Sequence, residues 1–150
     1  MSKPGFRVDY LNDQINELIS KCEHKILAIW ACDCAEHVIE IFEKEYPQDK
    51  RPRQAIDACR AWINDEITMW NARKFSFPAH ASAREADSKG TCAVARACGH
   101  AIGTAHVPTH ALHCATYSAK AVGYVNGDVN REREWQYNHL VKLYENQNRT

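Results

Sequence analysis

The sequence predicts an all-α fold, a single domain over residues 1–150 built as a bundle of six to eight alanine-rich helices. Three observations favour this fold class. Alanine is abundant, whereas the chain has only 6 Gly and 5 Pro. Apolar residues recur at helical spacing, and no stretch longer than four residues alternates as a half-buried strand would. A length of 150 residues suits one domain with one core.

The first two predicted helices follow the 3.6-residue apolar repeat. Asp9 is expected to cap a helix with an apolar face made of Leu11, Ile15, Leu18 and Ile19. A second helix is expected over 26–45, with an apolar stripe made of Ile26, Trp30, Cys34, Val38, Ile41 and Phe42. It should end at Tyr46 because Pro47 disfavours helical geometry in the residue before it.

The middle of the chain predicts shorter helices separated by prolines. Pro52 suits the first turn of a helix with inward-facing Ile56, Cys59, Trp62 and Ile63. A further helix is expected from Thr68 to Phe75, with Ile67, Trp70 and Phe75 available to the core. Pro78 either kinks this helix or separates it from the next segment, 79–86.

The C-terminal third predicts three more elements. Small apolar residues form a helix over 91–105, in which Gly99 and Gly103 are one turn apart, a spacing typical of a close helix crossing. The next helix opens at Pro108 and ends near Asn126. Asn130 is expected to cap the last helix, with inward-facing Trp135, Leu140, Leu143 and Tyr144.

Charge and hydropathy exclude several classes of partner. Lys+Arg and Asp+Glu are both 19, so the net charge is zero and offers no footprint for nucleic acid or an anionic membrane. The longest apolar run, 26–32, is too short to span a bilayer, and the first residues lack the apolar region of a secretory signal. Seven cysteines do not form a closed disulfide set, so reduced thiols in the cytoplasm are expected.

The histidines are the main candidates for chemistry, since four of the eight fall between His100 and His113. One interpretation is neutral buried imidazoles, each hydrogen-bonded to a carbonyl or carboxylate. The other is a site for zinc, a similar divalent metal or a small ligand, made by His80, Arg84, His100, His106, His110 and Cys114. No catalytic motif is present, so we expect no enzyme; a ligand-binding protein, or a metal-dependent enzyme using these histidines, is the alternative.

The charged residues of two neighbouring segments form a second candidate site. Asp33, Glu36, Glu40 and Glu43 recur at helical spacing, so they share one helix face. Such a face is either simply solvated or a docking surface for a basic protein. The contact residues we expect for a protein partner are Glu36, Glu40, Glu43, Arg51 and Arg53. Another possibility is a dimer packed through Trp135, Tyr137 and Tyr144; the sequence leaves the oligomeric state open.

Several short motifs between about residues 25 and 125 occur in combination. They are CAEH at 34–37, RPRQAI at 51–56, AREA at 83–86 and TAHVPTHA at 104–111. Together they resemble a bacterial family of small all-helical proteins classed as immunity proteins and linked to polymorphic toxin systems. The resemblance implies a cytoplasmic protein that binds a cognate toxin and neutralises it by protein–protein contact. It brings no established catalytic residue and no cofactor.

Overall fold

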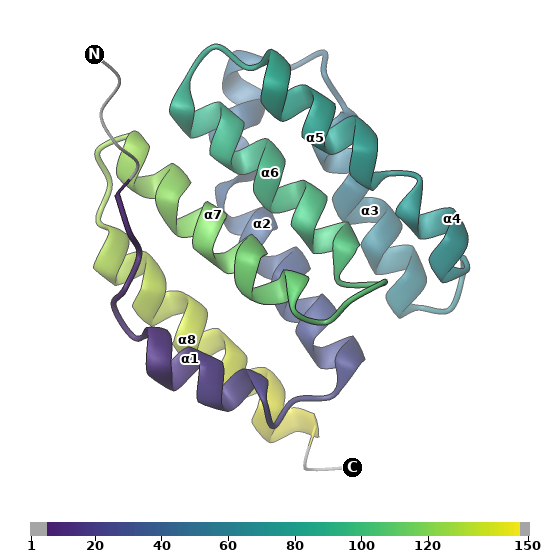
Figure 1. Ribbon diagram of the computed structural model, residues 1–150, viewed down its shortest axis with the longest axis vertical. Helices are drawn as coiled ribbons and strands as arrows, with labels where there is room; N and C mark the ends of the chain where they lie inside the picture. The colour runs from purple at the N-terminus through teal and green to yellow at the C-terminus, as the bar shows by residue number, and fades with distance from the viewer. Residues whose placement is uncertain (1–5, 148–150) are drawn as a thin grey trace.

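The structure is a computed structural model that describes residues 6–147, and this part of the chain is all-α, as the sequence predicts. Figure 1 shows its eight helices. They are α1 (Asn12–Ile19), α2 (His24–Glu45), α3 (Arg51–Ile63), α4 (Met69–Arg73), α5 (Ser76–Glu85), α6 (Lys89–Gly103), α7 (His110–Tyr124) and α8 (Val129–Gln147). Within residues 6–147, no helix combines the length and apolarity needed to cross a lipid bilayer.

Helix α6 is the centre of the bundle. It packs against α2, α3, α5 and α7, and in Figure 1 it lies between α5 and α7 with α2 and α3 behind. Its sequence, KGTCAVARACGHAIG, consists largely of small residues. Because small side chains let helix axes approach closely, four neighbours can pack around this one helix.

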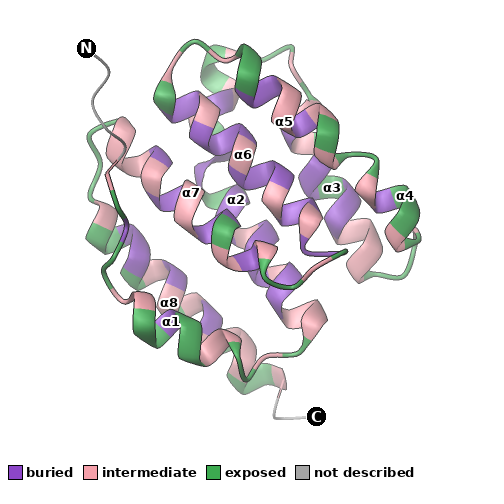
Figure 2. Ribbon diagram, in the orientation of Figure 1, coloured by how far each residue is buried: buried purple, intermediate pink, exposed green. Residues whose placement is uncertain are grey.

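Helix α2 is buried on more than the single stripe predicted from its repeat. Trp30, Cys34, Val38 and Phe42 are buried as expected, and so are Cys32 and further alanines of the same helix. The reason is tertiary, because α2 is in contact with α3, α6, α7 and α8. Figure 2 shows the buried positions concentrated on the helices around this centre.

Trp30 is the largest fully buried side chain and anchors α2 to α8. Its indole Nε1 donates a hydrogen bond to the backbone oxygen of Gln136, 2.9 Å away. It belongs to one hydrophobic cluster that extends from Ile15 of α1 to Leu140 of α8. Trp62, also expected in the core, is only half-buried, and its ring packs 4.9 Å from that of His24.

A buried polar network joins α8 to α7 and to the segment before α1. The guanidinium of Arg133, which is fully buried, donates to the Tyr10 carbonyl (3.1 Å), to Asn12 Oδ1 (3.3 Å) and to Gln136 Oε1 (3.0 Å). Gln136 Nε2 donates in turn to the carbonyl of Ala115 on α7, at 2.8 Å. The network satisfies polar groups that would otherwise be costly to bury.

The seven cysteines all lie within the described residues, and all are free thiols. Five of them are buried, at positions 32, 34, 59, 98 and 114. Burial raises the pKa of the Cys34 and Cys114 thiols well above the usual value, which keeps them protonated and unreactive. These residues therefore act as small apolar side chains in the alanine-rich core.

Two expectations about helix caps are wrong. Asp9 does not cap α1, because Leu11, with φ 61°, occupies the cap position and no side chain caps the helix. Asn130 lies inside the first turn of α8, and the Asp128 carboxylate accepts from Arg131 N at 3.1 Å instead. Neighbouring polar residues compete for one cap position, and the path of the preceding loop decides which of them occupies it.

The predicted helix from Thr68 to Phe75 is also wrong in part. Helix α4 covers only Met69–Arg73, and a separate helix begins at Ser76, with Pro78 in its first turn. Trp70 and Phe75, expected in the core, are 66% and 37% exposed. Breaking the helix removes the continuous face on which these aromatic residues would have turned inward.

Candidate functional site

The acidic residues of α2 pair with arginines of α3. Arg53 makes a two-pronged contact with Glu43, with nitrogen–oxygen distances of 2.8 and 3.1 Å, and its Nη1 contacts Glu36. Arg60 donates to Asp33 Oδ1 at 2.9 Å and to Glu36 Oε1 at 3.3 Å. We call these five residues the charged strip. Because each arginine contacts two carboxylates, the strip holds its side chains in fixed positions.

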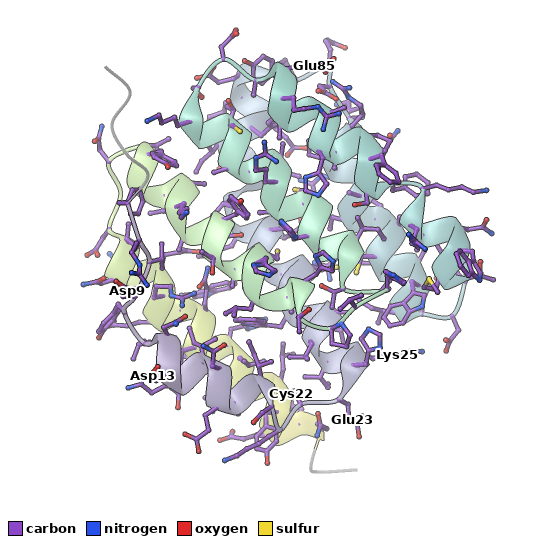
Figure 3. The ribbon with its side chains drawn as sticks, in the orientation of Figure 1. Asp9, Asp13, Cys22, Glu23, Lys25 and Glu85 are labelled. Carbon is purple, nitrogen blue, oxygen red and sulfur yellow. The ribbon has the colours of Figure 1, made fainter. Side chains whose placement is uncertain are left out.

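Two other predicted contact residues make no ion pair with the charged strip within residues 6–147. Arg51 makes two hydrogen bonds of 2.8 Å to Asp49 and also contacts Glu85, which lies at one end of the molecule in Figure 3, far from Glu23 at the start of α2. The Arg51 guanidinium holds the pKa of Asp49 down to about 2. Glu40 is exposed, and its only ion pair among the described residues is with Lys44 on the same helix, at 3.7 Å.

Sequence reasoning missed an apolar hollow on the other side of α3. It has a volume of about 330 Å³ and is lined by Gln54, Asp57, Ala58, Ala61, Ile67 and Phe75. We call it the α3–α5 hollow. Trp70 lies between Ile67 and Phe75 in the sequence, and the Arg73 guanidinium lies 5.4 Å from its ring centre. The apolar residues at 67–75 are the available signal, but their spacing predicts a core face rather than an exposed one.

The histidines do come together, but in a different set from the predicted one. His80 of α5, His100 of α6, and His110 and His113 of α7 form a cluster with neighbouring ring centres 5.1–6.2 Å apart. His100 and His110 share a hydrogen bond between their Nδ1 atoms at 2.9 Å. Tyr117, also absent from the prediction, stacks on His100 with ring centres 5.4 Å apart.

Gly99 and Gly103 make room for two of these imidazoles. A Cβ atom at Gly99 would lie 2.6 Å from His80 Nε2, and one at Gly103 would lie 2.9 Å from the His110 ring. The two glycines of α6 therefore admit side chains from α5 and α7. At the predicted close crossing, the rings of His80 and His110 lie against the backbone of α6.

The cluster favours neutral imidazoles. Burial, with repulsion from the other three histidines and Arg96, lowers the pKa of His100 to about 3. Burial also lowers the pKa of His80, helped by the charges of Arg96 and Arg84, and that of His110. His80 Nδ1 is buried without a hydrogen-bond partner among the described residues.

The remaining residues of the predicted metal site, Arg84, His106 and Cys114, lie outside this cluster. Cys114 is buried elsewhere, with its thiol donating to the Ala31 carbonyl at 3.1 Å. His106 and Arg84 are exposed, and of these two His106 lines a hollow with His110. Within residues 6–147, no group of three His, Cys, Asp or Glu side chains is arranged to hold a metal ion. Binding of zinc or another ligand by the histidines stays a prediction.

Trp135, one of the three aromatic residues of the predicted dimer contact, packs inside the chain. Trp135 stacks on His37, with ring centres 3.7 Å apart, and on His139, at 5.0 Å. The two histidines are held by carboxylates, His37 by Glu132 at 2.6 Å and His139 by Asp33 at 2.7 Å. This arrangement stabilises the contact of α2 with α8.

Comparison with known families provides the identification. Residues 17–143 match the family described as Imm-5 like putative immunity protein. The chain belongs to this family. Neither the comparison with curated proteins nor that with solved structures gives a significant match.

The Imm-5 like match extends further than the motifs that suggested such a family. Those motifs covered about residues 25–125, whereas the match reaches from within α1 into α8. The charged strip, the α3–α5 hollow and the histidine cluster all lie inside it. Each of these features is therefore a candidate for the activity of an Imm-5 like protein.

The lowered pKa of His100 predicts an acid-sensitive fold. In the unfolded chain His100 is protonated below about pH 6.5, whereas in the folded protein it is protonated only below about pH 3. Because the unfolded chain binds more protons between these values, the free energy of unfolding falls as pH falls. The free energy of unfolding changes by at most about 1.4 kcal/mol per pH unit for each such histidine. Urea unfolding between pH 7 and pH 5, above the range in which most carboxylates titrate, measures it.

The variant His100→Gln should show a shallower dependence on pH than the wild type over this range. His106→Gln, at an exposed position outside the cluster, is the matched control; it removes only a minor cause of the lowered pKa of His110, so it should change the slope less than His100→Gln does. If His100→Gln and the wild type depended on pH with equal slopes, the lowered pKa of His100 would be contradicted.

Proposed function

We propose that this protein is an immunity protein that binds a cognate bacterial toxin and neutralises it by contact rather than by catalysis. The observation that carries the proposal is the family match over residues 17–143. The structure supports it with a surface that has the features of a protein interface, on and around α3.

The α3–α5 hollow supplies the apolar centre of the proposed interface. Interfaces have an apolar core within a polar rim, and their energetic hot spots are rich in Trp, Tyr and Arg. Trp70, 66% exposed, stands beside Arg73 on α4, and Phe75 lines the hollow itself. Leaving such large rings exposed is costly unless a partner covers them.

The charged strip supplies the rim along one side of this centre. Arg53 and Arg60 face α2, whereas Gln54 and Asp57 of the same helix line the hollow. Since their ion pairs already fix the arginines, binding would cost little additional side-chain entropy. Glu40 is the acidic residue of α2 best placed to attract a basic toxin, because it is exposed and weakly paired.

The test is binding and protection with the toxin encoded beside this protein's gene. We expect a stable complex by titration calorimetry and survival of cells that express both proteins. Trp70→Ala should weaken binding by about 2 kcal/mol, or about 30-fold, if it is a hot spot. Its thermal midpoint should stay close to that of the wild type, since the ring is mostly outside the core.

Tyr10→Ala is the matched control, an exposed aromatic residue on the α1 side of the molecule. It should leave affinity for the toxin unchanged. Absence of both a complex and protection would overturn the proposed function. A complex that survives both Trp70→Ala and Phe75→Ala at full affinity would instead overturn only the assigned surface.

A further inference from the structure

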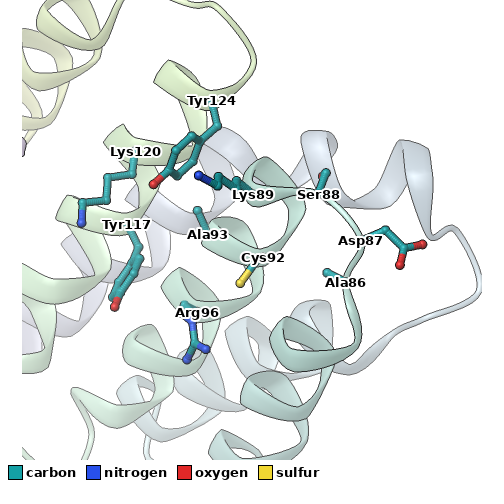
Figure 4. Close-up of a pocket in the computed structure, with 10 residues that line it drawn as sticks. All are labelled: Ala86, Asp87, Ser88, Lys89, Cys92, Ala93, Arg96, Tyr117, Lys120 and Tyr124. Carbon is teal, nitrogen blue, oxygen red and sulfur yellow. The ribbon is translucent and has the colours of Figure 1, made fainter. Parts of the chain in front are cut away.

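A pocket between α6 and α7 has no role in the proposed toxin contact. Figure 4 shows it beside the start of α6 and the second half of α7. Its volume is about 420 Å³, within the range of small-molecule sites. Its wall includes the cations Lys89, Arg96 and Lys120 and the phenol rings of Tyr117 and Tyr124.

The charge of this pocket is not balanced as it is between α2 and α3. On α3, Arg53 and Arg60 each contact two carboxylates. In the pocket, neither Arg96 nor Lys120 forms an ion pair with any carboxylate of residues 6–147. Asp87 is the one carboxylate in the wall, and Figure 4 shows it pointing away from the other charged groups. A concave surface with surplus positive charge attracts anions.

The tyrosines orient these cations and offer flat apolar surfaces. Lys120 Nζ lies 5.6 Å from the ring centre of Tyr117, and Lys89 Nζ lies 5.9 Å from that of Tyr124. At Lys120, a cation–π contact of this kind steadies the ammonium group, whose N–H donors can still bind an oxyanion. A ring or other planar group of a ligand could pack on the same two phenols.

The pocket lies next to the histidine cluster. Arg96 is one turn before His100 on α6, and Tyr117, in the pocket wall, stacks on the His100 ring. Arg96 therefore adds positive charge beside imidazoles that are already held neutral. A bound anion would offset the charge of Arg96, and the positive end of the α6 dipole at the pocket would add to its attraction.

We infer that this pocket binds a small phosphate ester, with the phosphate at Arg96 and Lys120 and the organic group against Tyr117 and Tyr124. A phosphate dianion matches two unpaired cations, and a guanidinium can contact two of its oxygens at once. The inference is independent of toxin binding, since it uses α6 and α7 rather than α3–α5.

The test uses adenosine 5′-monophosphate, inorganic phosphate and adenosine as probes of the full chain. Titration calorimetry and amide chemical shifts should show that the monophosphate binds more tightly than inorganic phosphate, and that adenosine does not bind measurably. Shift changes should cluster on the first half of α6 and the second half of α7. Added salt should weaken binding, because the attraction is ionic.

Variants distinguish a specific binding site from non-specific attraction of the phosphate to basic residues. Arg96→Gln should weaken binding of the monophosphate by about tenfold or more, the loss expected for one charge-assisted hydrogen bond. Lys120→Gln should weaken it as well. Lys142→Gln, which removes an equal charge from the exposed side of α8, should leave it unchanged.

Three results would overturn the inference. One is the absence of shift changes at saturating monophosphate. Another is an equal loss in Lys142→Gln and Arg96→Gln, which would indicate charge attraction without a site. The third is equal affinity for inorganic phosphate and the monophosphate, which would remove the organic group from the proposed ligand.

Discussion

Trp30→Ala is expected to lower the free energy of unfolding by about 3–5 kcal/mol, the usual cost of removing a large aromatic side chain from a core. The ring is fully buried, so its loss leaves a cavity beneath α2. Its Nε1 also donates to the Gln136 carbonyl, which would be left without that partner. Urea unfolding followed by far-ultraviolet circular dichroism measures the change.

Trp62→Ala is the matched control for this loss. It removes the same side chain from a half-buried site against His24, so its cost should be clearly smaller. If the two variants were equally destabilised, the central position of Trp30 in the core would be contradicted.

Arg133→Ala is expected to cost about 2–4 kcal/mol, because buried acceptors lose their donor. The guanidinium donates hydrogen bonds to the Tyr10 carbonyl, Asn12 Oδ1 and Gln136 Oε1. Burial also lowers the pKa of Arg133, so the charge itself carries a desolvation cost that its removal would recover. The expected value is the balance of these opposing effects.

Two further variants show which effect dominates at Arg133. Both Arg133→Met and Arg133→Ala remove the charge, but Arg133→Met keeps much of the volume, so it should be less destabilised by the packing of its longer side chain. Arg131→Ala, an exposed neighbour on α8, should change stability by no more than about 0.5 kcal/mol.

Hydrogen exchange locates the effect of Arg133→Ala. We expect faster exchange for the amides of α1, because Arg133 ties the segment before that helix to α8. Unchanged exchange in α1, together with wild-type stability, would contradict a structural role for the network.

Local chemistry was enough to predict most of the helices. Pro47 stops α2 at Glu45, and Pro52 lies in the first turn of α3, because proline acts on its own backbone and on the residue before it. The apolar repeat located the helices around Ile15 and Leu140 for the same reason, since helical periodicity is a property of adjacent turns. The family motifs are also local, and the family they suggested is shown by the match over residues 17–143.

The candidate sites could be predicted only in part. Spacing on α2 put Glu36 and Glu43 on one face, but it could not show that Arg53 of α3 lies between them. Spacing on α7 paired His110 with Cys114, whereas the structure places His110 against His100 of α6 and turns Cys114 toward α2. A helical repeat indicates which residues share a face of one helix. It does not indicate which residues lie opposite that face, because they come from other parts of the chain.

Residues close together in the chain are enough to predict the fold class, the approximate helices and the family of this protein. The packing of the helices decides that Trp70 is exposed and Trp30 buried, that four histidines meet beside Gly99 and Gly103, and that Arg96 forms no ion pair with a carboxylate of residues 6–147. The physical reason is that burial and charge pairing depend on how helices pack. That packing brings together residues far apart in sequence, and helical periodicity carries no information about it.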